Sequence, residues 1–156
     1  MQEPSEPRPD WQPPPGSWAS SEAARRTMRA NRRRDTKPEL AIRSAVHRMG
    51  LRYRVDVAPL PDRRRRADIV FPRQRVAVYV DGCFWHGCPE HGLVPRAHRD
   101  YWLEKIGRNR ERDAETDAAL REAGWMVVRV WEHEESTVAA ARVAEVVNSC
   151  GARDAK

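Results

Sequence analysis

The sequence predicts a single α/β domain in which helices pack against a mixed β-sheet. Apolar residues recur with helical spacing in three segments, and four short segments carry the apolar pattern of strands. Their order along the chain is helix, three strands, helix, strand, helix. Strands joined by short links favour an antiparallel meander, and a strand reached through a long helix can return parallel to its neighbour.

The chain is expected to form one structured domain over residues 21–150. Residues 1–20 contain half of the 12 prolines, which favours a disordered or loosely docked tail. A short basic helix is expected within 21–34, and residues 151–156 are expected to be a flexible C-terminus.

The first firm element is a helix that Thr36 caps and Gly50 ends. Pro38 lies in its first turn, and Glu39 follows the cap by three residues, as in a capping box. Its apolar stripe consists of Ile42, Ala45, Val46 and Met49.

Three strands are expected next, at 51–57, 67–71 and 75–82, with a hairpin turn at 72–75. The third is almost continuously apolar, as in a strand covered on both faces. The first alternates, so its apolar residues should share one face: Leu51, Tyr53, Val55 and Val57.

A long helix is expected from about residue 97 to residue 123, where Gly124 would stop it. Residues 125–131 then form another buried strand, and Ser136 or Thr137 begins the last helix.

The net charge of +6 is carried largely by clustered arginines, which fits a phosphate-backbone partner. A solvated basic surface would give the same count. The N-terminal residues do not resemble a signal peptide, and no apolar run approaches the length of a membrane span. We therefore expect a cytoplasmic, nucleoid-associated protein with no membrane partner, and a monomer.

Acidic residues mark the ends of two neighbouring strands. Asp68 follows four arginines and opens one strand, and Asp81 ends the next. If these strands form a hairpin, both carboxylates lie near one edge of the sheet, where their repulsion favours a bound cation such as Mg²⁺. The alternative for Asp68 is an ion pair with a neighbouring arginine. Glu39 is explained by capping alone, although a first-turn glutamate can also face a metal.

Cysteine and histidine cluster after the third strand. Cys83, Cys88 and His91 have zinc-type spacing, and His133 is the best candidate for a fourth ligand. His86 is a rival ligand, but its position beside the acidic residues makes it a candidate general base. Thiolates suit Zn²⁺ and carboxylates suit Mg²⁺, so the two metals would separate by ligand type.

Aromatic and basic residues accompany these sites. Phe84 and Trp85 adjoin the zinc-type ligands, and Trp102 lies in the long helix. Such rings can stack on bases or wedge into a base step, or they can cover the zinc site or join the core. The same helix carries a set of side chains suited to phosphate contact if one face meets DNA, or to a solvated face: Lys105, Arg108, Asn109, Arg110 and Arg112.

These residues resemble the very-short-patch repair (Vsr) mismatch endonucleases. The matching stretches are MRANRRRDTKPEL, RRADIVF, DGCFWHGCPEHG, YWLEKIGRNRERD and GWMVVRVWEHE, in the family's order. The resemblance implies a restriction-endonuclease-like fold with a structural zinc. It also implies Mg²⁺-dependent nicking of double-stranded DNA 5′ of the T in a T:G mismatch, the lesion left when 5-methylcytosine deaminates.

The resemblance also implies residue roles. Asp68 matches the metal-binding aspartate, Glu39 a catalytic glutamate and His86 the catalytic base. The aromatics that intercalate beside the mismatch match Phe84, Trp85 and Trp102. The zinc ligands match Cys83, Cys88, His91 and His133, although the family's best-described members have a cysteine at the position of His133.

A second departure concerns the metal site. Where those members have threonine and histidine, this sequence has Val80 and Asp81. The main-chain carbonyl of Val80 can bind Mg²⁺ as the threonine carbonyl does. Asp81 could add a carboxylate to the metal or change which group handles the proton.

Two other functions stay open at this point. One is a restriction-type or general DNA nuclease on the same fold, and the other is a non-catalytic, zinc-stabilised DNA-binding module. The flanking-sequence preference, the range of mismatches, the role of the tail and any repair partners do not follow from the sequence.

Overall fold

A computed structural model describes residues 35–153, and the expected tail at 1–20 and basic helix at 21–34 lie outside the described residues. The expected order of elements is confirmed over this range. The helices are α2 (Lys37–Arg48), α3 (Arg99–Glu122) and α4 (Ser136–Arg153). The strands are β1 (Arg54–Val57), β2 (Ala67–Phe71), β3 (Val76–Asp81) and β4 (Met126–Trp131).

The four strands form one mixed sheet in the order β1-β2-β3-β4. The β1–β2 and β2–β3 pairs are antiparallel, as the short links between them require. The β3–β4 pair is parallel, and its register joins Val76 to Met126 and Asp81 to Trp131. The crossover between these two parallel strands is α3. Within the described residues, the expected mixed sheet is thus confirmed, and the restriction-endonuclease-like classification stays a prediction.

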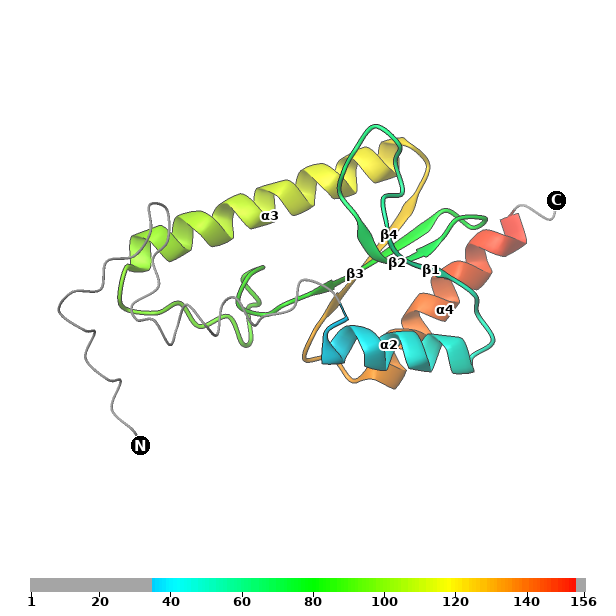
Figure 1. Cartoon of the computed structure of the whole chain (residues 1–156), viewed down its shortest axis with the longest axis horizontal. Helices are drawn as coiled ribbons and strands as arrows, with labels where there is room; N and C mark the ends of the chain where they lie inside the picture. The colour runs from blue at the N-terminus through cyan, green and yellow to red at the C-terminus, as the bar shows by residue number, and fades with distance from the viewer. Residues whose placement is uncertain (1–34, 154–156) are drawn as a thin grey trace. The chain divides into compact units, whose positions relative to one another are not determined.

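Helices cover both faces of this sheet (Figure 1). α2 and α4 pack on one face, where Ile42, Val46 and Val143 join Ile69 and Val78 in the larger core cluster. α3 lies on the other face, where its residue Leu120 packs with Val70 and Ala77. Coverage on both faces explains why β3 is nearly all apolar.

The structure corrects the prediction that the apolar residues of 51–57 share one face. Leu51 and Tyr53 pack against the core beneath α2 and α4, whereas Val57 packs on the α3 side. Asp56, directly before Val57, has a left-handed backbone with φ of 51°. This turn of the chain interrupts the alternation that a regular strand would keep.

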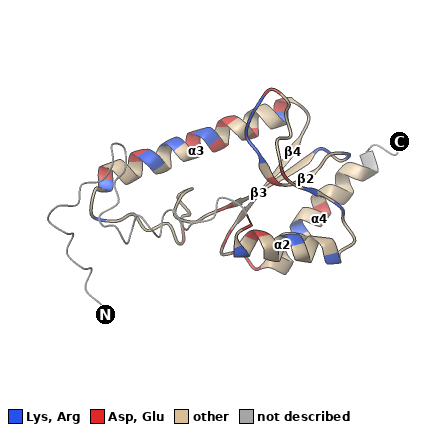
Figure 2. Cartoon of the chain, viewed as in Figure 1, with Lys and Arg blue, Asp and Glu red and all other residues tan. Residues whose placement is uncertain are grey.

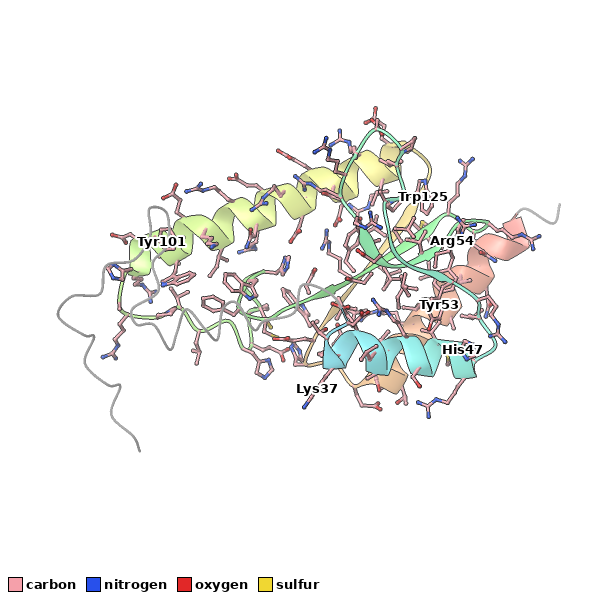
Figure 3. All side chains as sticks on the ribbon, in the orientation of Figure 1. Lys37, His47, Tyr53, Arg54, Tyr101 and Trp125 are labelled. Carbon is pink, nitrogen blue, oxygen red and sulfur yellow. The ribbon has the colours of Figure 1, made fainter. Side chains whose placement is uncertain are left out.

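α3 is the longest described helix, and Tyr101 and Trp125 mark its two ends in Figure 3. It ends at Gly124 as predicted, where φ is 83°, a value that side chains rarely tolerate. α4 runs to Arg153, three residues beyond the domain end expected at 150. No helix in the described part of the chain is both long and apolar enough to cross a bilayer.

Gly107, within α3, and Gly124, just beyond its end, should respond in opposite directions to alanine. Gly124→Ala places a Cβ on a left-handed residue and should lower the free energy of unfolding by about 1 kcal/mol. Gly107→Ala has open space around the new Cβ and lies within the helix, so it should raise that free energy by about 0.5–1 kcal/mol. Urea unfolding followed by circular dichroism measures both, and equal shifts would contradict this account of how α3 ends.

Candidate active site and cysteine-histidine cluster

Asp68 lies in β2 beside the end of β3. Its Oδ2 accepts a hydrogen bond from the Val80 main-chain nitrogen at 2.7 Å. Burial is the main reason that the pKa of Asp68 is raised to about 6, and the negative charges of Glu39 and Asp81 raise it further. The three carboxylates therefore gather at one end of the sheet, as the hairpin argument predicted for Asp68 and Asp81.

Glu39 acts at the start of α2 and is 5% exposed. Its main-chain nitrogen donates to Thr36 Oγ1 at 3.4 Å, so the predicted cap is present. Its Oε2 accepts from the Asp35 nitrogen at 2.9 Å and from Arg43 Nη2 at 3.2 Å. Tyr53, labelled in Figure 3, donates to the Arg43 carbonyl at 2.8 Å and so fixes that turn of α2. Glu39 is therefore both a cap residue and a buried, arginine-paired carboxylate.

Asp81 is paired with Arg129, which reaches it from β4. Arg129 Nη1 lies 3.0 and 3.1 Å from the two carboxylate oxygens of Asp81. The same guanidinium donates to Asp117 of α3 at 2.7 Å and lies over the ring of Tyr79, 4.6 Å from its centroid. Contacts on three sides leave Arg129 little freedom, so it holds Asp81 in place.

His86 forms a hydrogen-bonded pair with Asp113 of α3. The His86 Nδ1 to Asp113 Oδ2 distance is 2.5 Å, and Asp81 Oδ1 lies 3.9 Å from the same nitrogen. Burial lowers the pKa of His86, but the Asp113 hydrogen bond and the charge of Asp81 outweigh it, so the net shift is upward. Burial raises the pKa of Asp113, but the His86 hydrogen bond and the charge of Arg129 lower it overall. Nδ1 is therefore engaged by carboxylates, whereas Nε2 has no hydrogen-bond partner among the described residues.

Sequence reasoning missed three residues of this site: Asp113, Asp117 and Arg129. Two signals were present. Asn109, Asp113 and Asp117 recur every four residues and so share one face of α3, and Arg129 is a lone charge within a buried strand. From the sequence alone, the charges along α3 indicate DNA contacts or a solvated face instead.

The zinc-type residues converge as predicted: Cys83, Cys88, His91 and His133 offer ligand atoms that all lie within 4.8 Å of one another. His133 Nδ1 is 3.2 Å from Cys83 Sγ and 3.7 Å from Cys88 Sγ. Ligands of a tetrahedral zinc lie about 3.3–3.8 Å apart, so the spacing fits that metal. Burial and the neighbouring Cys88 raise the pKa of the Cys83 thiol to about 11, and a cation would reverse this by stabilising the thiolate.

The described residues contain two groups that could hold a metal ion, and the two differ in the type of ligand atom that they offer. The second group consists of Asp81, His86 and Asp113. Asp68 and Glu39 belong to neither group. The cysteine-histidine cluster is thus separate from the carboxylates that surround His86.

The aromatic residues pack on one another. Phe84 lies 5.0 Å from Trp85 and 5.4 Å from Trp102, centroid to centroid. Phe84 and Trp85 are partly exposed, whereas Trp102 is 6% exposed and lies beneath them. Lys105 Nζ sits 5.3 Å from the centroid of Trp85. Phe84 and Trp85 thus form a small aromatic surface that Trp102 supports.

Asn109 and Arg110, the other residues expected to meet DNA, are placed differently. Asn109 donates to the Trp85 carbonyl at 2.9 Å and accepts from Arg112 at 2.7 Å, so both ends of its amide are used within the protein. Arg110 is exposed, and its side chain passes close to Gly87. A Cβ added to Gly87 would lie 3.5 Å from Arg110 Cδ. The structure thus gives Asn109 a positioning role that the sequence did not suggest.

Comparison with known proteins identifies the family of the chain. Residues 19–90 match the family model described as DNA mismatch endonuclease Vsr. The type II nicking enzyme V.NaeI of Lentzea aerocolonigenes is 50% identical over 79% of this chain and 75% of its own. The type II nicking enzyme V.XorIIP of Xanthomonas oryzae pv. oryzae is 43% identical over 78% of this chain and 88% of its own. The DNA mismatch endonuclease Vsr of Escherichia coli (strain K12) is 40% identical over 69% of this chain and 67% of its own. The chain therefore belongs to the Vsr family and is a DNA endonuclease.

Proposed function

We propose that this endonuclease nicks one strand of double-stranded DNA, 5′ of the T in a T:G mismatch, in very-short-patch repair of deaminated 5-methylcytosine. The names of its relatives support both halves of the proposal, because one is a mismatch endonuclease and others are nicking enzymes. The observation that carries it is an acidic centre at Asp68 that has no ion pair within the described part of the chain, together with a histidine–aspartate pair and an aromatic surface.

The acidic centre fits a hard divalent cation. Among the described residues, Glu39 has Arg43 as its partner and Asp81 has Arg129, but Asp68 has no ion-pair partner. Asp68 and the main-chain carbonyl of Val80 would hold Mg²⁺. When bound, the cation supplies charge that polarises the scissile phosphate and stabilises the leaving 3′-oxygen. Glu39, held by Arg43, adds negative potential from the other side.

His86 is suited to accept a proton from the attacking water. Asp113 engages Nδ1, which fixes the ring and favours the tautomer with a free Nε2. Asp81 lies near the same nitrogen, and its oxygens are held by Arg129. We therefore assign Asp81 to the orientation of His86 rather than to the metal.

Phe84 and Trp85 would open the duplex beside the mismatch. They are partly exposed, whereas Trp102, which packs against both, is buried. Wedging costs a few kcal/mol for a normal base step and less beside a wobble pair, which stacks less well. The selectivity would therefore come from the lower cost of unstacking at T:G.

A panel of substrates distinguishes this proposal from its nearest alternative. The alternative is a nuclease that nicks its own recognition sequence in matched DNA. Labelled duplexes carrying T:G, T:A, C:G or A:C at one position, in randomised flanking sequence, are incubated with Mg²⁺, and the nicked strand is sequenced. We expect nicks 5′ of the mismatched T and at least 10-fold slower cleavage of T:A. Equal cleavage of matched and mismatched duplexes would contradict the mismatch proposal and favour the alternative.

The substitution Asp68→Asn should lower nicking activity without lowering the stability of the protein. Losing the carboxylate should lower nicking by roughly three orders of magnitude and leave Mg²⁺-free DNA binding unchanged. Because the folded protein raises the pKa of Asp68 from 3.8 to about 6, it holds that proton more tightly than the unfolded chain does. The free energy of unfolding therefore falls as pH rises through this window, and the loss is complete above it.

The Asp68→Asn variant has no carboxyl group at this position, so its free energy of unfolding does not fall in this way as the pH rises. At pH 8 without Mg²⁺, its free energy of unfolding should exceed the wild-type value by on the order of 2 kcal/mol, and the gap should shrink towards pH 4. Urea unfolding at both pH values measures the gap. A less stable variant at pH 8 would mean that Asp68 already has a compensating partner.

The cysteine-histidine cluster should hold one structural Zn²⁺ per chain. Elemental analysis of the purified protein is expected to find it, and Cys83→Ser should lose it together with several kcal/mol of stability. Cys150→Ser is the matched control, because Cys150 lies in α4, is buried in the core and belongs to neither ligand group. Equal zinc content in both variants would overturn the assignment.

A further inference from the structure

A pocket of about 220 Å³ lies between α3 and the loop that joins β1 to β2. It is lined by Arg65, His86, Asn109, Arg112 and Asp113. None of the residues assigned to Mg²⁺ lines it, whereas His86 does. The pocket is therefore next to the acidic centre but distinct from it.

Arg65 is fixed at one edge of this pocket. Its Nη1 donates to the Arg112 carbonyl and to Thr116 Oγ1, which ties the arginine-rich loop to α3 (Figure 2). In the described part of the chain its other nitrogens make no hydrogen bond, and its one carboxylate neighbour, Glu115, is 3.8 Å away and exposed. Arg65 thus keeps donors for a ligand while its position is held.

Arg112 is the second arginine of the pocket. Its Nη2 donates to Asn109 Oδ1 at 2.7 Å, and it has no carboxylate partner among the described residues. The one acidic group of the pocket, Asp113, is engaged by His86 and lies 3.7 Å from Arg129. The pocket therefore presents two guanidinium groups that hydrogen bonds hold, one with the exposed Glu115 as its ion-pair neighbour and one with none among the described residues.

We propose that Arg65 and Arg112 bind one phosphodiester of the DNA backbone, next to the phosphate that is cut. The proposal rests on the proposed nicking function. Guanidinium groups match the geometry of phosphate oxygens, and pre-positioned ones lose less side-chain freedom on binding. The scissile phosphate has to reach Asp68, which does not line the pocket, so the phosphate held there is its neighbour on the same strand. This contact sets which phosphate reaches His86.

The test combines arginine variants with single neutral phosphates. Arg65→Gln and Arg112→Gln are compared with Arg64→Gln, an exposed neighbour in the same loop that does not line the pocket. Binding to a T:G duplex is measured by fluorescence anisotropy without Mg²⁺ at several salt concentrations. A second set of duplexes carries one methylphosphonate at each position around the expected nick.

Each pocket variant should weaken binding about 10-fold and reduce the salt slope by about 1, independent of flanking sequence. One methylphosphonate should weaken wild-type binding by a similar factor, and the same substitution should have little effect on the pocket variants. Arg64→Gln should keep the wild-type response at that position. Melting temperatures identify any variant that fails to fold, and the wild-type methylphosphonate scan needs no variant.

The inference is overturned if both pocket variants keep the methylphosphonate response of the wild type, or if no single phosphate next to the nick matters. Either result can occur with normal T:G nicking, in which case the proposed function stands. Loss of the response in the pocket variants together with equal nicking of matched DNA would contradict the mismatch proposal and leave the subsite intact.

Discussion

The site depends on how three carboxylates share two arginines. Burying like charges together is unfavourable unless each finds a partner. Arg43 compensates Glu39 from within α2, and Arg129 compensates Asp81 from β4. Among the described residues, Asp68 has no ion pair and accepts the Val80 main-chain N–H, and burial raises the pKa of its carboxyl. Arg43 also pairs with Asp35, and Arg129 also pairs with Asp113 and Asp117, so neither arginine is left to compensate Asp68, which is where a divalent cation would be most strongly bound.

The cysteine-histidine cluster gives His86 its position. His86 lies in the segment between β3 and α3, which has no strand or helix of its own. Cys83 and Cys88 anchor this segment to His133 beyond β4, and Asn109 anchors it to α3 through the Trp85 carbonyl. Anchors on both sides of His86 replace the hydrogen-bond ladder that a strand would supply. A metal at the cluster would therefore affect catalysis through the position of His86, without touching the substrate.

Local patterns predicted the elements well because the information for them is local. Thr36, Glu39 and Gly124 act where capping and left-handed geometry place them, and β3 is apolar because both its faces are covered. The partners across the fold were not predictable in this way. Arg129 meets Asp81 across the parallel β3–β4 pair, 48 residues away in sequence, and nothing near either residue reveals the other.

Because partners across the fold do not follow from local patterns, the sequence left the partner of Asp81 open and placed Val57 on the wrong face. Asp81 carries the same charge whether it binds a metal, an arginine or a histidine, and only the arrangement in space distinguishes these. Val57 follows the alternation of its strand in sequence, but the left-handed Asp56 sends it to the other face. Patterns therefore indicate which residue types could form the site, and the fold decides which of these groups are paired with one another.

The chain connects the aromatic surface to the proton acceptor directly. Trp85 and His86 are consecutive residues, so their Cα atoms are about 3.8 Å apart whatever DNA is bound. If the aromatic residue that opens the base step and the residue that accepts the proton lay on separate elements, they could shift relative to each other as the duplex deforms. If Trp85 opens the base step and His86 accepts the proton as proposed, the backbone spacing between these two groups is set by covalent geometry on the protein side. The cut should then keep a fixed register to the mismatch, because the remaining freedom lies in the DNA, where a phosphate contact at Arg65 and Arg112 would restrict it.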